Sequence, residues 1–272
     1  MENNKAIGVF DSGLGGLTSV GRLSQLLPGE DIIYLGDTGR VPYGGRSKET
    51  IIKYATQDVE FLLKQEIKAI LVACATVSSN ALEEISPKYE IPIYGVVEPT
   101  AKSAANATVN GKIGIIGTEA SIRSRAYEKL ILKEAPTVEL FSKACPLLTP
   151  LVENGRFRPG DVVIETVVRE YLEPIKNAGV DTLILGCTHY PLLGDVISEF
   201  MGDNVRLINS GAAGAEFVAE QLSGKGMLTS RKVEGKHQYF VSDSAESFSG
   251  LASIFLQRDA THEVKQIELG NV

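Results

Sequence analysis

The sequence predicts an α/β protein of two related lobes, each a mainly parallel sheet flanked by helices, with a pseudo-twofold relation and a site in the cleft between them. Two observations carry this prediction. Short apolar runs alternate with longer amphipathic segments, and part of the first half of the chain repeats in the second half. Strands that alternate with helices along a chain are typical of parallel sheets covered by helices.

The predicted strands are short runs, most of them rich in Val and Ile, and most are followed by Gly, Asp, Ser, Thr or Cys. Runs of this length and composition are typical of strands that are buried on both faces of a sheet. They are Ala6–Phe10, Asp31–Leu35, Ala69–Ala73, Ile91–Val96, Ile113–Ile116, Val138–Phe141, Thr182–Leu185, Val205–Ile208 and Gln238–Val241.

Amphipathic segments between these runs predict helices. Ser47–Lys64 carries its apolar residues on one face, and Ser47 and Thr50 are candidate caps at its start. The other predicted helices are Ser78–Ile85, Ser121–Lys133, Asp161–Asn177 and, before the polar stretch Ser223–Lys236, Ala212–Leu222.

The internal repeat relates two strand–turn units in each half of the chain. Ile7–Ser12 resembles Ile113–Thr118, and Ala69–Cys74 resembles Thr182–Cys187. Each half thus contains a strand that ends in a small hydroxyl residue and a strand that ends in Cys, as two related lobes would. We expect the end of the chain to return to the first lobe, which is then discontinuous. The expected limits are residues 1–98 plus 208–272 for the first lobe and 99–207 for the second.

The charge and hydropathy of the chain exclude some partners. The formal net charge is −7, which disfavours nucleic acid as the main partner because phosphate binding needs a basic face. No apolar run approaches the roughly 20 residues that a membrane-spanning helix needs. The first residues also lack the features of a secretory signal. We therefore expect a cytoplasmic protein with no membrane partner.

The cysteines and histidines do not form a recognisable framework. They are Cys74, Cys145 and Cys187, and His189, His237 and His262. Three cysteines far apart in a reducing compartment disfavour disulfides. Cys187 and His189 supply only half of a tetrahedral ligand set, so we expect no metal site.

Cys74 and Cys187 are the strongest candidates for chemistry. Each follows a buried strand and precedes a predicted helix, and ligands of open α/β sheets bind at the carboxyl ends of strands. A thiol beside a helix N-terminus is favoured as the thiolate. Thr76 and Thr188 follow the two cysteines closely, and their hydroxyls are candidates to cap a helix or bind a carboxylate.

A single cysteine at a strand end is usually a small buried apolar residue, and this is our interpretation of Cys145. Two cysteines at equivalent points of a repeat instead favour two sulfurs that face one cleft. Such a pair suits the inversion of a stereocentre, which removes a proton from one face and delivers one to the other. His189 lies close enough in sequence to polarise the thiol of Cys187.

The loop Asp11–Gly16 allows more than one interpretation. It is compatible with a plain strand–helix turn, in which glycines permit tight turns and close approach of the backbone to a ligand. It is also compatible with a nucleotide-phosphate loop, although Thr18 stands where the dinucleotide fingerprint has its third glycine. A nucleotide-dependent oxidoreductase is therefore a distant alternative.

Several segments together carry a family resemblance: Asp11-Ser12-Gly13-x-Gly15-Gly16, Gly36-Asp37-Thr38, Pro42-Tyr43-Gly44, Ala73-Cys74-x-Thr76, Gly117-Thr118, Val152-Glu153 and Gly186-Cys187-Thr188-His189-Tyr190-Pro191-Leu192-Leu193. On these segments the chain resembles the bacterial glutamate racemases over essentially its full length.

The resemblance implies that L- or D-glutamate binds between the lobes, with no pyridoxal phosphate or other cofactor. It implies that Cys74 deprotonates D-glutamate and Cys187 deprotonates L-glutamate, and that the D-glutamate feeds peptidoglycan synthesis. It also implies a homodimer. The residues it implies as helpers of the thiols are Asp11, His189, Asp37 and Glu153. Those it implies for substrate binding are Asp11, Ser12, Pro42, Tyr43, Gly44, Ala75, Thr76, Thr118, Thr188 and His189.

The chain departs from the family at a few positions. Ala75 stands where the family has an Asn whose amide would contact the substrate, and losing such a contact costs on the order of 1–3 kcal/mol. Turnover would fall by about 5- to 150-fold. Ser121 stands where Thr is commoner and keeps the hydroxyl, and Gly39 and Val41 also differ.

Two further functions stay open at this point. The same chemistry could act on aspartate or another acidic amino acid, although the Asp-Ser-Gly and Pro-Tyr-Gly segments favour glutamate. Alternatively, Ala75 marks a regulatory protein that binds glutamate and turns it over slowly.

Overall fold

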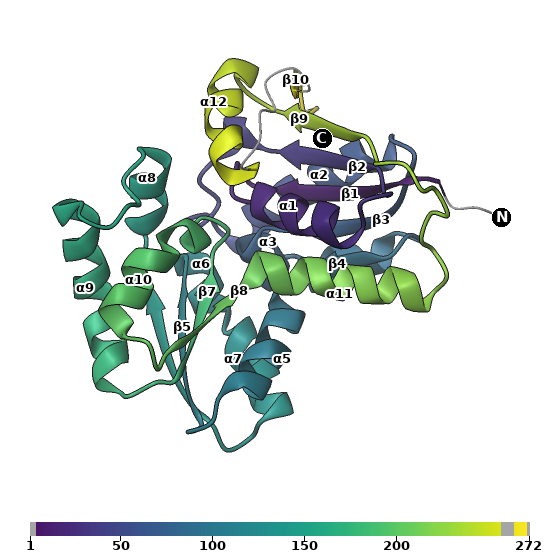
Figure 1. Cartoon of the computed structure of the whole chain (residues 1–272). Helices are drawn as coiled ribbons and strands as arrows, with labels where there is room; N and C mark the ends of the chain where they lie inside the picture. The colour runs from purple at the N-terminus through teal and green to yellow at the C-terminus, as the bar shows by residue number, and fades with distance from the viewer. Residues whose placement is uncertain (1–3, 257–263, 271–272) are drawn as a thin grey trace.

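Two parallel sheets flanked by helices make up the protein (Figure 1). The computed structural model describes residues 4–256 and 264–270, so His262 and residues 1–3 lie outside the described residues. Every strand pairing in both sheets is parallel. The predicted α/β class and the division into two lobes are confirmed.

The first sheet has the strand order β10-β9-β2-β1-β3-β4. Its strands are β1 (Ala6–Asp11), β2 (Ile32–Gly36), β3 (Ile67–Val72), β4 (Ile93–Gly95), β9 (His237–Val241) and β10 (Val264–Gln266). Since β9 pairs with β2, the last part of the chain returns to the first sheet as predicted. The sequence analysis missed β10, a three-residue strand, because Val-Lys-Gln forms no apolar run.

The second sheet repeats the topology of the first. Its order is β6-β5-β7-β8, which matches β2-β1-β3-β4 strand for strand. Its strands are β5 (Lys112–Gly117), β6 (Glu139–Ala144), β7 (Thr182–Gly186) and β8 (Arg206–Asn209). The internal repeat seen in the sequence therefore extends to the order in which the strands pair.

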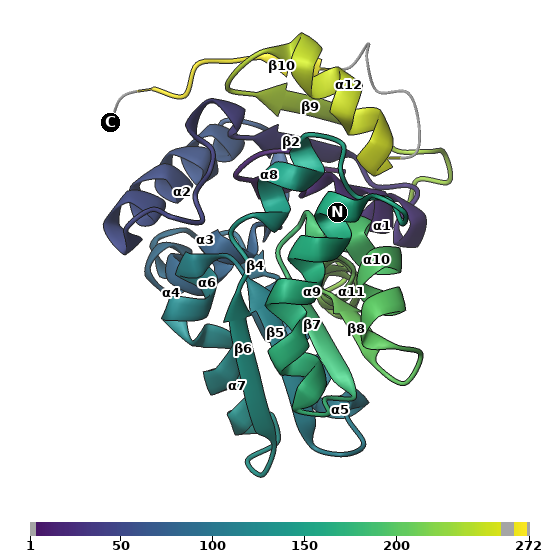
Figure 2. The ribbon, with the colours of Figure 1, turned by 90° about the vertical axis from the view of Figure 1, so that its left-hand side faces the viewer.

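Helices cover both faces of each sheet (Figures 1 and 2). On the first sheet, α1 packs against α11 and α12, whereas α2 packs against α3 and α4 on the other face. On the second, α5 packs against α7, and α9 packs against α10. The helices are α1 (Leu17–Leu26), α2 (Lys48–Leu63), α3 (Ala75–Asn80), α4 (Leu82–Ile85), α5 (Val97–Ala107), α6 (Glu119–Ser124), α7 (Ala126–Glu134), α8 (Leu148–Glu153), α9 (Val162–Asn177), α10 (Gly194–Met201), α11 (Ser210–Gly224) and α12 (Ala245–Leu256). Short 3-10 helices are η1 (Thr38–Arg40), η2 (Ser86–Lys88) and η3 (Tyr190–Leu193).

Side-chain caps fix the starts of several helices. Ser47 caps α2 as predicted, because its hydroxyl accepts a hydrogen bond from the backbone N–H of Thr50 at 3.3 Å. Asp161 caps α9 in the same way, and Asn209 caps α11. The Asn209 cap turns the chain directly from β8 into α11, which packs on both α1 and α5. The exact lobe limits of 1–98 plus 208–272 and 99–207 stay a prediction.

Two predicted helices are wrong in extent. The structure divides Ser78–Ile85 into α3 and α4 at Ala81, whose φ of −121° is not helical. It divides Ser121–Lys133 into α6 and α7 at Arg125, whose φ of 54° lies in the left-handed region. A left-handed residue ends a helix because its carbonyl and N–H leave the helical direction, and periodicity alone does not reveal this.

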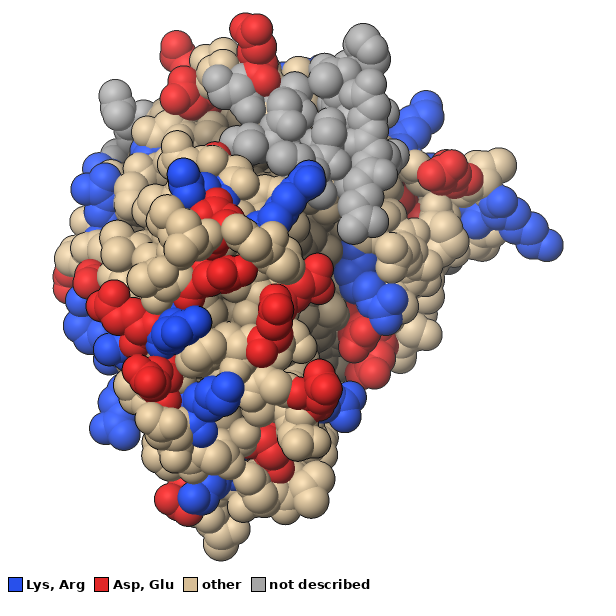
Figure 3. Space-filling model, turned by 60° about the vertical axis from the view of Figure 1, so that its left-hand side comes forward, with Lys and Arg blue, Asp and Glu red and all other residues tan. Residues whose placement is uncertain are grey.

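Charged side chains are mixed on the surface. On the face shown in Figure 3, Asp and Glu side chains are interspersed with Lys and Arg among the residues coloured there. None of the helices in the described ranges has the length and apolar character that a bilayer crossing requires.

The two lobes approach each other closely at Gly15, in the loop between β1 and α1. A Cβ atom at Gly15 would lie 2.2 Å from Oγ1 of Thr188 and 2.9 Å from Nδ1 of His189. Gly44 is similarly close to Thr118, and its carbonyl accepts a hydrogen bond from the N–H of Ala120 at 2.9 Å. The sequence left two uses open for the glycines of the first loop, a plain turn or close approach to a ligand. At Gly15, the missing side chain instead lets Thr188 and His189 of the second lobe approach the backbone.

The substitution Gly15→Ala tests this contact. It should lower the free energy of unfolding by about 1–3 kcal/mol, because a methyl group must displace Thr188 or His189. Gly21→Ala, within α1, is the matched control: no atom lies within 4 Å of its added Cβ. That control should be neutral or stabilising by about 0.5–1 kcal/mol. Urea unfolding measures both, and equal effects would contradict the proposed contact.

Candidate active site

A cavity of about 330 Å³ lies between the two sheets. It opens at the carboxyl ends of β1 and β3 in the first sheet and of β5 and β7 in the second. In a doubly wound sheet with this strand order, the chain leaves neighbouring strands in opposite directions at this point and creates a crevice. The lining residues are Ser12, Val41, Pro42, Tyr43, Gly44, Gly45, Cys74, Ala75, Thr76, Thr118, Glu119, Pro146, Thr149, Pro150, Glu153, Cys187, Thr188 and His189.

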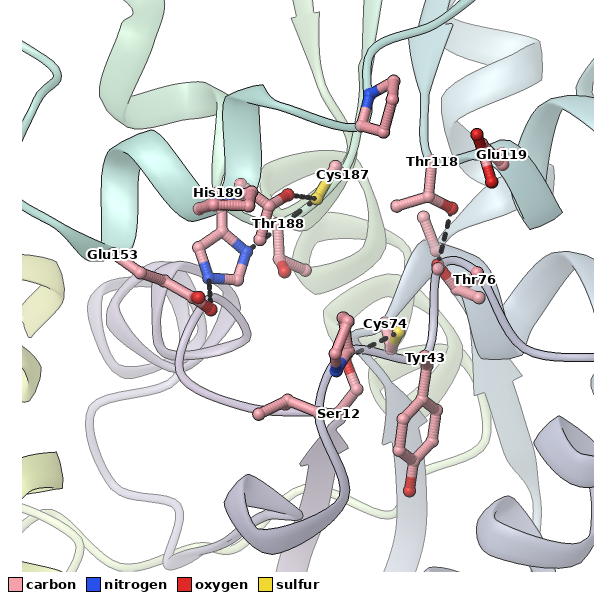
Figure 4. Close-up of a pocket in the computed structure, with 18 residues that line it drawn as sticks. Ser12, Tyr43, Cys74, Thr76, Thr118, Glu119, Glu153, Cys187, Thr188 and His189 are labelled. Atoms are coloured by element: carbon pink, nitrogen blue, oxygen red, sulfur yellow. Dashed lines mark hydrogen bonds and ion pairs between the residues drawn. The ribbon is translucent and has the colours of Figure 1, made fainter.

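Cys74 and Cys187 both line this cavity, and each belongs to a different lobe (Figure 4). Cys74 comes two residues after β3 and is the N-cap residue of α3, whereas Cys187 directly follows β7. β3 and β7 are equivalent strands of the two sheets. The sulfurs therefore reach one cavity from matching positions of the repeat.

The chain after Cys187 differs from the expectation. We predicted that a helix directly follows each cysteine, and α3 follows Cys74 in this way. After Cys187, the 3-10 helix η3 comes first, and α10 begins only at Gly194. Pro191 lies in the first turn of η3, where its missing N–H costs no hydrogen bond.

Cys74 lies in surroundings that favour the neutral thiol. Its S–H donates to the hydroxyl of Ser12 at 3.4 Å. Burial, reinforced by the nearby negative charge of Asp11, raises the pKa of Cys74 to about 12. Cys74 is therefore protonated at neutral pH.

Cys187 lies beside a chain of polar groups. Its sulfur is 3.8 Å from Nδ1 of His189 and 3.5 Å from the hydroxyl of Thr149. On the far side of the ring, Nε2 of His189 is 3.1 Å from a carboxylate oxygen of Glu153. Burial opposes the charged imidazolium, but hydrogen bonds to Cys187 and Glu153 and their charges outweigh it and raise the pKa of His189 to about 10. His189 is thus a cation at neutral pH.

Asp11 lies behind the cavity wall, where the lobes meet. It is fully buried, and its carboxylate accepts hydrogen bonds from the N–H of Gly13 at 3.1 Å and the hydroxyl of Thr188 at 3.4 Å. Burial raises the pKa of Asp11, and the charge of His189 opposes that rise. Asp11 consequently acts on Cys74 through the electrostatic field rather than by direct contact.

The hydroxyls of Thr76 and Thr118 form part of one wall of the site, and that of Ser121 lies behind them. The hydroxyls of Thr76 and Thr118 are 2.9 Å apart, and that of Thr118 donates to Ser121 at 3.0 Å. Thr76 therefore does not cap a helix. Instead, Thr118 caps α6 by accepting from the N–H of Ser121. Ser121, where the family commonly has Thr, keeps its hydroxyl in this network.

Asp37 lies behind Tyr43 and does not line the cavity. The Tyr43 hydroxyl donates to Asp37 and lies 3.3 Å from Asp58, and Arg40 reaches both carboxylates, at 2.5 and 3.0 Å. The hydroxyl of Ser242, just after β9, donates to Asp37 at 2.6 Å. Burial, with the charge of Asp37, raises the pKa of Asp58. Asp37 therefore influences the site by holding Tyr43.

Most of the predicted site residues share the cavity. Those that line it are Ser12, Pro42, Tyr43, Gly44, Cys74, Ala75, Thr76, Thr118, Glu153, Cys187, Thr188 and His189. Asp11 and Asp37 lie behind it. Cys145 is buried outside it, at the end of β6, as interpreted from the sequence. The described residues include no group of three His, Cys, Asp or Glu arranged to hold a metal ion.

The sequence analysis missed several residues that contact the site residues. Thr149 and Arg40 are two of them. The only signal for Thr149 is its position four residues before Glu153, which puts both on one face of α8. Arg40 has no signal, because its two carboxylate partners come from different segments. Glu119 also lines the cavity unexpectedly.

Comparison with known proteins gives a consistent result. Residues 24–218 match the family model described as Asp/Glu/Hydantoin racemase. The chain is 47% identical over 252 residues to a glutamate racemase of Geobacter metallireducens, covering 93% of each chain. The structure matches that of glutamate racemase isoform RacE1 from Bacillus anthracis with a TM-score of 0.93 and 38% identity, covering 98% of both chains. It also matches a Francisella tularensis glutamate racemase in complex with D-glutamate, with a TM-score of 0.90 and 35% identity over 98% of both chains.

The charge on His189 predicts how stability changes with pH. Its pKa of about 10 in the folded protein exceeds the ordinary value of about 6.5. The stability that protonated His189 contributes is complete below pH 6.5 and is lost as the pH rises through 10. The difference in free energy of unfolding between wild type and His189→Gln should therefore shrink from pH 6 to pH 10. Urea unfolding across this range measures it, and a constant difference would contradict the protonated histidine.

Proposed function

The chain belongs to the Asp/Glu/Hydantoin racemase family, and on this premise we propose that it is a glutamate racemase that uses two thiols and no cofactor. The observation that carries the proposal is the pair of cysteines at equivalent strand ends that face a single cavity. A reaction that inverts one carbon needs an acid and a base on opposite faces of that carbon, and this pair supplies both.

The reaction is a pair of proton transfers. With L-glutamate, the thiolate of Cys187 takes the α-proton: the Cα–H bond breaks, an S–H bond forms, and the electron pair stays on Cα. The thiol of Cys74 then gives its proton to the opposite face, and its own sulfur becomes the thiolate. D-glutamate follows the same steps in reverse, with the roles of the sulfurs exchanged.

The resting protonation states suit the reaction of L-glutamate. Burial and Asp11 keep Cys74 protonated, so it is ready to donate. We assign the role of base toward L-glutamate to Cys187, whose sulfur lies 3.8 Å from Nδ1 of His189. Glu153 holds the ring of His189 from its other side, which fixes the ring's orientation.

Most of the donors that hold the substrate are neutral. No Lys or Arg is among the described residues that line the cavity, so hydroxyls and backbone N–H groups would meet the two carboxylates of glutamate, with His189 as the one positively charged group. We assign this role to Ser12, Thr76, Thr118 and Thr188, together with the Tyr43–Gly44 segment. Fixed dipoles in a site shielded from water stabilise the negative charge that develops on the substrate.

The choice of glutamate over aspartate rests on the relatives. The proteins compared above are described as glutamate racemases, and one of them was solved with D-glutamate. The two amino acids differ by one methylene group, which the 330 Å³ cavity accommodates. We infer further, from the family alone, that the D-glutamate formed supplies peptidoglycan synthesis and that the enzyme is a homodimer.

Ala75 favours one alternative function. Its methyl group lines the cavity immediately after Cys74 and offers no hydrogen bond. A chain that lacks this contact could bind glutamate and turn it over too slowly to matter, as a regulatory protein would. Both thiols and their polar partners are nevertheless present, and this supports catalysis.

Removal of either thiol tests the two-thiol reaction. Cys74→Ala and Cys187→Ala should each lower racemisation by about 10²–10⁴-fold or more, because each removes an acid/base group. Circular dichroism of L- and then D-glutamate, without added cofactor, follows the rate. Cys145→Ala, also a buried cysteine, is the matched control and should keep its activity. Undiminished racemisation in either of the first two variants would sink the proposal.

The substitution Ala75→Asn separates the racemase from the binding protein. An amide at this position should raise kcat/KM by about 5- to 150-fold, since one substrate hydrogen bond is restored. The binding of L-glutamate and its turnover are also measured with the unsubstituted chain. If that chain binds glutamate in a calorimeter without turning it over, the regulatory function takes precedence.

A further inference from the structure

Each catalytic sulfur has a hydroxyl partner that comes from a different element. Cys74 donates to Ser12, in the loop after β1, at 3.4 Å. The sulfur of Cys187 lies 3.5 Å from the hydroxyl of Thr149, on α8. Ser12 belongs to the motifs on which the family resemblance rests, whereas Thr149 belongs to none of them. The partner of Cys187 is therefore a feature of this chain that the family motifs do not specify.

Thr149 is the second residue of α8, so the carbonyl four residues before it, that of Cys145, lies outside the helix. The hydroxyls of Thr56, Thr100 and Thr166, farther along their helices, each donate to the carbonyl four residues earlier. That of Thr149 points to the sulfur of Cys187 instead, into the cavity. It is thus available to respond to the charge of the sulfur.

A second partner lets the hydroxyl serve both states of the thiol. Tyr190 lies near Thr149, and its own hydroxyl donates to the carbonyl of Cys145 at 2.9 Å, which leaves the Tyr190 oxygen able to accept. A hydroxyl both donates and accepts. When Cys187 is a thiolate, Thr149 can donate to it. When Cys187 is a thiol, it can donate to Thr149, whose proton then turns to Tyr190.

We propose that Thr149 is a positioning residue for Cys187, which donates a hydrogen bond to the thiolate before proton abstraction and accepts one from the thiol afterwards. The assignment rests on the proposed two-thiol reaction. Hydrogen bonds to a charged group are stronger than those between neutral groups, so the contact favours the thiolate. It complements His189, whose Nδ1 lies 3.8 Å from the same sulfur.

Other titratable groups around Cys187 remain in place when the hydroxyl is removed. They are His189 and Tyr190 from its own segment, Cys74 across the cavity, Asp11 behind Thr188, Glu153 on α8, Tyr127 on α7 and Cys145 after β6. Thr149→Val changes none of these groups and nearly preserves the volume of the side chain.

The experiment measures the alkylation of each cysteine by iodoacetamide against pH, with peptides resolved by mass spectrometry. In Thr149→Val, the pH midpoint for Cys187 should rise by about 1 to 2 units while that for Cys74 stays unchanged. Thr149→Ser should restore the wild-type profile because it keeps the hydroxyl. Thr166→Val, an exposed helical threonine, should leave both profiles unchanged.

The kinetics of Thr149→Val provide a second test. In Thr149→Val, kcat/KM should fall by about 10- to 100-fold, and equally for L- and D-glutamate, because the two enantiomers have equal free energies. Unchanged alkylation of Cys187 in Thr149→Val and in Thr149→Ala would overturn the assignment. The alkylation profile does not depend on turnover, so a failure of the racemase proposal would be recognised separately, as glutamate left unracemised by the wild type.

Discussion

The close contact between the lobes at Gly15 is the constraint on which the site depends. Two equivalent strand ends can act on one carbon atom only if the lobes bring them to opposite walls of one small cavity. The backbone at Gly15 lies so near Thr188 that no side chain fits between them. The bond between Thr188 and Asp11 crosses the same boundary, as does that between Thr76 and Thr118. The packing of the two lobes therefore sets the geometry of the site.

Repetition of the fold does not make the two sulfurs alike. Cys74 is held as a thiol by burial and by Asp11, and its S–H donates a hydrogen bond to the hydroxyl of Ser12. Cys187 has a protonated histidine beside it and a hydroxyl that can donate. Under the proposed two-thiol reaction, this asymmetry would provide one acid and one base, which a proton exchange across a carbon requires. Each turnover would then exchange the roles of the two sulfurs.

Much of this arrangement could be predicted from the sequence. The repeat places Cys74 and Cys187 at matching strand ends, and the carboxyl ends of parallel strands lie at the same edge of a sheet, where ligands bind. Local signals also predicted the Ser47 cap and the strand that the structure shows as β9. Other features depend on contacts between distant segments and leave no local pattern. Arg40 joins Asp37 to Asp58, Thr149 reaches Cys187 from α8, and Arg125 breaks a helix that periodicity alone would continue.

The origin of the hydrogen that the product carries tests the central claim most directly. Enzyme equilibrated in D2O is given protiated L-glutamate, and both enantiomers are examined by mass spectrometry during the first turnovers. If two thiols act on opposite faces, the D-glutamate formed carries deuterium at Cα from the start, while the remaining L-glutamate keeps its protium. Product that retains protium, or deuterium that enters both enantiomers at equal initial rates, would mean that a single base carries the proton across, and would contradict the account.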